Sequence, residues 1–171
     1  MASLATLRDA YLGAIWEGST NVIALDVQRA IVKDGCLAPF AGFVAARLEN
    51  VHERAAKPAA DLVRTALADV QQRAAAWPRR EDGELEARAV AETLYHVLAT
   101  ALLLEEGQTL RGRRGDFRKL LVATLYARRW LAPATPGAPP FSWRTLAHLE
   151  RLVDWHPIAA GALAGDPAGH C

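Results

Sequence analysis

The stretch LEARAVAETLYHVLATALLLEEG, residues 85–107, decides the fold. Apolar residues recur in it every three or four positions, which is the period of an amphipathic helix rather than of a strand. Its apolar content rises over residues 99–104. We therefore expect one long helix at residues 85–106, with its second half at the centre of a helical bundle. Gly107 follows the last periodic residue and is expected to end the helix.

The same period recurs on both sides of this helix, and no segment shows the sustained alternation that is typical of strands. Five further helices are expected, at residues 21–33, 39–56, 58–77, 117–131 and 143–153. Gly35 is expected to end the first of them. The proline-rich stretch 132–140 cannot be helical, and the tail from residue 159 is expected to fray. The sequence therefore predicts an all-α bundle of about six helices.

Composition excludes several classes of protein. The 171 residues suffice for one domain, 51% of them are apolar, and the net charge of +1 argues against a globally basic nucleic-acid binder. Cys36 and Cys171 cannot make a disulfide framework or a cysteine-rich metal site. The N-terminus lacks the pattern of a signal peptide, and the apolar run 93–104 is too short to span a bilayer. We expect a soluble, cytoplasmic protein.

A second stretch, GAIWEGSTNVIALDVQR at residues 13–29, carries the candidate site. Glu17 stands there between Trp16 and Gly18, just before an expected helix start. A short polar side chain at residues 19–21 can cap that helix by accepting hydrogen bonds from its first N–H groups. On these residues alone, Glu17 is either a solvated turn residue or a base held where a substrate reaches it.

The run IWEGS, with Asn21 and LDVQR after it, resembles the acyl-CoA dehydrogenase family, and most closely its AidB-type, alkylation-response branch. The run RDAYLGA at residues 8–14 also fits the family's approach to that motif, so the resemblance covers about residues 8–32. Thr20 stands where the branch usually has glycine. The resemblance implies that residues 1–34 end the family's C-terminal helical domain and that residues 35–171 form a helical extension.

The resemblance also implies roles for individual residues. Glu17 matches the base that removes the α-proton of an acyl-CoA thioester while the β-hydride passes to FAD. The positions implied for FAD contact are Gly18, Ser19 and Asn21, and those implied for the substrate cavity are Trp16 and Arg29. Trp16 would exclude water and raise the pKa of the Glu17 carboxyl, whereas the following helix would favour the anion.

Enzymes of this family have an N-terminal helical domain and a middle β domain that form most walls of the FAD and thioester sites. This chain begins where the family's final catalytic segment begins. We therefore expect it to be inactive alone and to hold no FAD without those domains. Its expected interactions are pairing with that missing portion or, as in the family, assembly into a homo-oligomer.

A second hypothesis rests on the basic patch, which we define as Arg111, Arg113, Arg114, Arg118 and Lys119. AidB-type proteins have been linked to duplex DNA through their C-terminal region, so the resemblance implies phosphate contacts here. The chain would then be a non-enzymatic helical module that binds DNA or a partner protein. The simpler interpretation is a solvated loop between helices, with Asp116 as a partial counter-charge.

The five histidines are not spaced as metal ligands with acids or cysteines, so no metal site is expected. His96, inside the long predicted helix, is expected to be a hydrogen-bonded core residue. The tryptophans of the second half, among them Trp130 and Trp155, are expected to pack between helices.

Overall fold

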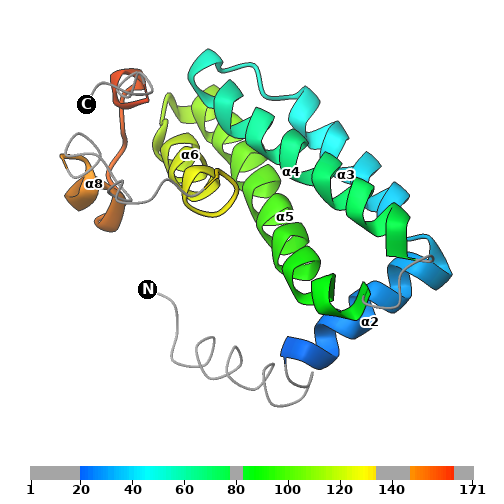
Figure 1. The fold of residues 1–171 in the computed structure, drawn as a ribbon. Coiled ribbons are helices and arrows are strands. Elements are labelled where there is room, and N and C mark those ends of the chain that lie inside the picture. The colour runs from blue at the N-terminus through cyan, green and yellow to red at the C-terminus, as the bar shows by residue number, and fades with distance from the viewer. Residues whose placement is uncertain (1–19, 78–82, 134–146, 164–171) are drawn as a thin grey trace, which may run out of the picture.

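The computed structural model describes residues 20–77, 83–133 and 147–163 (Figure 1). They form six α-helices and two short 3-10 helices. The α-helices are α2 (Thr20–Asp34), α3 (Leu37–Glu49), α4 (Lys57–Ala76), α5 (Gly83–Arg114), α6 (Arg118–Trp130) and α8 (Leu149–Val153). The 3-10 helices are η1 (Arg54–Ala56) and η3 (Ala160–Ala162).

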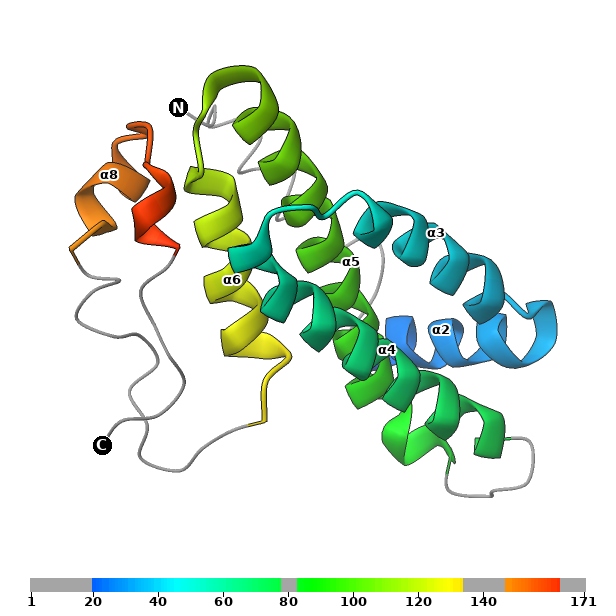
Figure 2. The same cartoon turned by 90° about the horizontal axis from the view of Figure 1, so that it is seen from above.

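The long helix α5 lies at the centre and contacts α2, α3, α4 and α6 (Figure 1, Figure 2). Its second half has no exposed surface at Val97, Ala101 and Leu104. These side chains belong to one core cluster with Val63 of α4 and Leu120 of α6. Burying a side chain of valine or leucine size contributes roughly 1.5–3 kcal/mol, so this layer holds the bundle together. The predicted central position of this half-helix is confirmed.

A smaller core cluster attaches α2 to the bundle. Ile31 of α2 packs there against Val70 of α4, against Trp77, which follows α4, and against Val90 of α5. Within α2 itself only Ala24 and Ile31 are buried. The helix that follows the candidate motif is thus held by a narrow stripe, and most of its surface faces outward.

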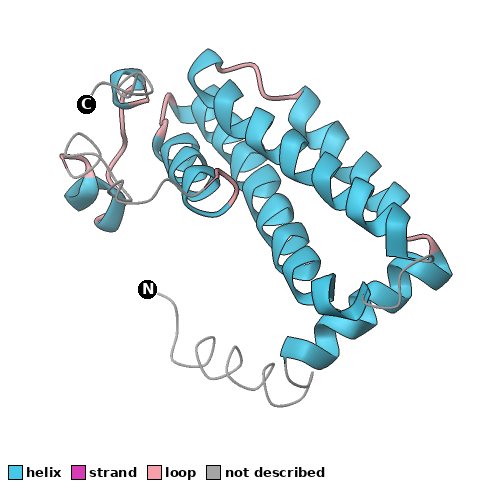
Figure 3. Ribbon diagram, in the orientation of Figure 1, coloured by secondary structure: helices cyan, strands magenta, loops and turns pink. Residues whose placement is uncertain are grey.

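The all-α prediction is confirmed for the part of the chain that the structure describes, which contains helices and loops and no strand (Figure 3). The predicted helices 21–33, 58–77 and 117–131 match α2, α4 and α6 to within one residue at each end. Gly35 ends α2 with a φ of +64°, which glycine adopts without strain. Of the helix predicted at 143–153, residues 143–146 lie outside the described residues, as does the stretch 134–140.

The predicted helix 39–56 is confirmed over residues 39–49 and wrong beyond them, because α3 ends at Glu49 and η1 intervenes before α4. Val51 is buried although it lies between the helices, so the apolar period continues across the break. Hydrogen bonds of polar groups stabilise the segment between α3 and α4, and these groups are not spaced with the period of a helix. The Glu53 carboxylate accepts a hydrogen bond from the Ala55 N–H at 3.4 Å, and the Gln108 amide donates to the Asn50 carbonyl at 3.0 Å.

The prediction that Gly107 ends the long helix is also wrong. The helix continues to Arg114, and Gly115, with a φ of +64°, follows its last residue. Gly107 is buried inside α5 against α6, where an added Cβ would lie 2.6 Å from Leu120 Cδ2 and 2.9 Å from the Leu120 backbone nitrogen. This glycine therefore serves the close approach of two helices rather than a helix end.

The C-terminal part of the described chain is fastened to the turn between α5 and α6. Ile158 is 2% exposed, and its N–H donates to the Asp116 carboxylate at 3.1 Å. The Ile158 carbonyl accepts from the Phe117 N–H at 2.9 Å, and Asp116 also accepts from the Arg118 N–H at 2.9 Å. The expectation that the chain frays from residue 159 is wrong for residues 160–162, which form η3; residues 164–171 lie outside the described part.

Asp116→Ala is expected to release this attachment. Two backbone N–H groups lose a charged acceptor, so the free energy of unfolding should fall by about 1–2 kcal/mol. Trypsin should also cleave faster after Arg151, which lies in α8. Urea unfolding and timed proteolysis measure the two effects. Asp154→Ala removes an exposed carboxylate of the same segment and is the control; equal cleavage rates in both variants would show that Asp116 does not hold the segment.

Candidate functional site

The candidate motif leads directly into the N-terminus of α2. Thr20 is the first residue of this helix, and Asn21 is exposed in its first turn, which carries no acidic side chain. The N–H groups of a first helical turn lack intrahelical partners and favour anions or electron-rich atoms. Trp16, Glu17, Gly18 and Ser19 lie outside the described residues. The structure therefore places Asn21 and the helix start, and leaves the positions of the other motif residues as predictions.

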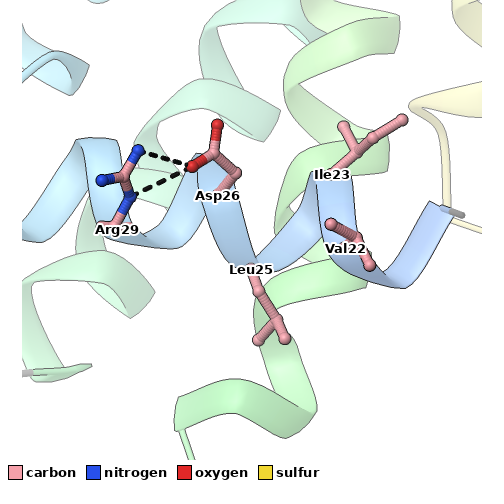
Figure 4. Close-up of a pocket in the computed structure, with 5 residues that line it drawn as sticks. All are labelled: Val22, Ile23, Leu25, Asp26 and Arg29. Atoms are coloured by element: carbon pink, nitrogen blue, oxygen red, sulfur yellow. Dashed lines mark hydrogen bonds and ion pairs between the residues drawn. The ribbon is translucent and has the colours of Figure 1, made fainter. Parts of the chain in front are cut away.

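A depression of about 510 Å³ lies along the outer surface of α2 (Figure 4). The described residues that line it all come from this helix: Val22, Ile23, Leu25, Asp26 and Arg29. Arg29 donates two hydrogen bonds to one Asp26 carboxylate oxygen, at 2.7 and 3.0 Å. Both side chains are more than half exposed, so the pair contributes little to stability. Arg29 thus lines this depression with its charge balanced by Asp26, and its place in a substrate cavity stays a prediction.

FAD fits this region only in part. Because a single helix supplies the walls of the depression, no second wall is present among the described residues to enclose a flavin ring. Asn21 and the N–H groups in the first turn of α2 can contact one edge of such a ring. The described residues therefore offer an edge of a flavin site and not a complete one.

The basic patch lies where α5 ends and α6 begins, and not in a long loop. The arginines at 111, 113 and 114 form the last turn of α5, and Arg118 and Lys119 the first turn of α6. Three of the five cations face acids. Arg111 pairs with Glu53 at 2.9 Å, Lys119 with Glu106, and Arg118 lies 3.9 Å from Asp116.

Among the described residues, these ion pairs leave two cations of the patch without an acidic partner. Arg113 and Arg114 are exposed, and no acidic side chain among the described residues pairs with them. Glu53 lies just before η1 and Glu106 lies within α5, so the basic run by itself did not reveal that they balance its charge.

His96 is half-buried between α5 and α6, so its predicted hydrogen bond is confirmed and its predicted core position is wrong. Its ring stacks on Trp130 at a centroid distance of 4.5 Å and an interplanar angle of 9°. Its Nδ1 lies 2.8 Å from the Tyr126 hydroxyl. Burial lowers the pKa of His96, and nearby Glu92 opposes this shift. The neutral ring can therefore share a hydrogen bond with Tyr126 at neutral pH, and Trp130 packs against α5 as expected.

Two further features of the described residues concern a metal site and a membrane-spanning helix. No group of three or more potential metal ligands occurs among the described residues. Helix α5 is long and apolar enough to cross a membrane by length and composition. The central helix of a bundle passes the same test, and α5 contacts four other helices here.

Comparisons of the chain with protein-family models, with curated proteins and with solved structures found no match. The resemblance to acyl-CoA dehydrogenases therefore rests on the residues between 8 and 32 alone. What the described structure adds to it is the position of α2.

Proposed function

We propose that this chain is the C-terminal part of a flavin-dependent, AidB-like acyl-CoA dehydrogenase. In this proposal the Glu17 carboxylate removes the α-proton of an acyl-CoA thioester. The ordered resemblance at residues 8–32 motivates it, and the observation that carries it is helix α2, whose first described residue, Thr20, lies three residues after Glu17. The first turn of α2 is free of acids and exposes Asn21, as a contact with an electron-rich cofactor edge requires.

The outer surface of α2 carries exposed apolar side chains, which supports the proposal that another part of the enzyme covers this helix. Val22 is 58% exposed, Leu25 43% and Val32 47%. Apolar residues gathered on one exposed helix mark a surface that another protein part covers. We assign that covering role to a flavin-holding portion of the enzyme, in a cytoplasmic assembly.

Each group then has a distinct task. FAD, when bound, supplies the acceptor for the β-hydride. Glu17 takes the α-proton, so that a double bond forms between the α and β carbons. Asn21 and the N–H groups of α2 hold one edge of the cofactor. Substrate chain length depends on walls outside this chain.

Retention of flavin tests this proposal. The chain should elute colourless from gel filtration when expressed alone and should retain flavin when co-expressed with an AidB-type flavin-holding portion. Asn21→Ala should lower the amount of flavin retained, because one contact at the cofactor edge is lost. Gln71→Ala, an exposed change on α4, is the control. Flavin bound to the chain alone, or a colourless complex, would contradict the proposal.

DNA binding is the second candidate function, and the exposure of Arg113 and Arg114 is the observation that favours it. Two available cations predict a slope of about −2 in a plot of log binding constant against log salt concentration, whereas five would give about −4.5. Fluorescence anisotropy with a short duplex measures this slope. Replacing both arginines by alanine should abolish binding at low salt, and unchanged binding by the double variant would remove this candidate.

A further inference from the structure

A pocket of about 360 Å³ lies between α2, α3 and α5, and it shares the side chain of Ile23 with the depression on the outer surface of α2. Its inner wall includes Ile31, which is 8% exposed, and its rim includes Ile23 and Tyr95, which are 40% and 65% exposed. Helix α5 also contributes Leu94 and Leu98. The pocket therefore opens to the surface at one side and reaches the smaller core cluster at the other.

The chemistry of the wall is almost entirely hydrocarbon. Among the described residues that line the pocket none has a charged side chain, and Cys36 and Tyr95 are the two whose side chains carry a heteroatom. Water in such a space touches carbon and finds few hydrogen-bond partners, so its displacement by an apolar molecule is favourable. Charged ligands would lose hydration without gaining a partner.

Small residues create the space. Ala30 of α2 and Ala91 of α5 line the pocket, and a larger side chain at either position would project into it. Along α2 the lining runs from Ile23 to Ile31, which is about 12 Å at the rise of an α-helix. The volume is within the range of pockets that take small molecules.

From these observations we propose that the pocket between α2, α3 and α5 binds a neutral, largely apolar small molecule, such as a short alkyl chain or a two-ring aromatic compound. The Tyr95 hydroxyl is hydrogen-bonded to Tyr126, so the pocket recognises a ligand by apolar contact. The site does not rest on the dehydrogenase proposal, since it uses none of the residues assigned there to proton abstraction, FAD contact or the substrate cavity.

Titration of the full chain with the neutral fluorescent probe phenylnaphthylamine tests this site. The expected result is saturable binding of one probe per chain. Ala91→Phe and Ala30→Phe fill the pocket from two different helices and should each weaken binding at least about tenfold. Ala89→Phe places the same ring on an exposed position of α5 and should leave binding unchanged. Circular dichroism melts show whether each variant is folded.

Protection of Cys36 supplies an independent readout. In a Cys171→Ser background, saturating probe should slow the reaction of Cys36 with N-ethylmaleimide, and Ala91→Phe should remove this protection. Absence of saturable binding, or equal binding by all three phenylalanine variants, would overturn the proposal. So would a dimer of the chain that Ala91→Phe dissociates, because the pocket would then belong to an interface between copies.

Discussion

Gly107→Ala is expected to lower the free energy of unfolding by about 3 kcal/mol and Tm by roughly 5–10 °C. The new Cβ would lie 2.6 Å from Leu120 Cδ2, 2.8 Å from its Cγ and 2.9 Å from its backbone nitrogen. A change in the Leu120 side-chain conformation would leave the contact between the new Cβ and the Leu120 backbone nitrogen in place. Helix α6 must therefore shift away from α5. Leu120 and Leu104, both without exposed surface, would lose packing together.

Gly112→Ala is the matched control, because an added Cβ there has no atom within 4 Å. Both glycines lie inside α5, and alanine is the better helix former by about 1 kcal/mol. We therefore expect the control to be slightly more stable than the wild type in urea unfolding. Equal effects of the two substitutions would show that the close approach of α5 and α6 is not set by Gly107.

Glu17→Gln is expected to lower turnover of an acyl-CoA thioester by about 10³-fold in the complex with a flavin-holding portion. Glutamine keeps the size of the side chain but cannot take a proton, so flavin should still be retained. Steady-state assays and the flavin content of the purified complex measure the two quantities. Glu49→Gln, at the end of α3, is the control and should leave both unchanged. Unchanged turnover of Glu17→Gln would exclude this residue as the base.

Apolar periodicity predicted a helix well where the periodic run of apolar residues stops at the same residue as the helix, as in α2, α4 and α6. It failed at Val51, because a side chain in a loop is buried as deeply as one on the preceding helix. The prediction of a helix end from glycine failed at Gly107, because glycine serves two structural purposes. Glycine ends a helix when its φ is positive, as at Gly115, and permits close packing when it lies within a helix. Sequence alone does not separate these cases, because the partner, Leu120, lies on another helix.

The candidate site was less predictable than the fold. The helix start beside Asn21 followed from local capping chemistry, whereas the pairing of Arg111 with Glu53 depended on how α5 packs on a distant segment. Asp116 was expected only to balance charge, and its carboxylate instead binds two backbone N–H groups, one of them 42 residues away along the chain. Contacts of this kind carry no local sequence pattern.

Bleaching of flavin by substrate is the most direct test of the proposed role of Glu17. The complex of this chain with a flavin-holding portion is mixed with an acyl-CoA thioester in the absence of oxygen, and the visible absorbance of the flavin is followed. The account predicts loss of this absorbance in the wild-type complex and its persistence in Glu17→Gln. A wild-type complex that keeps its absorbance, or a variant that bleaches as fast as the wild type, would contradict it.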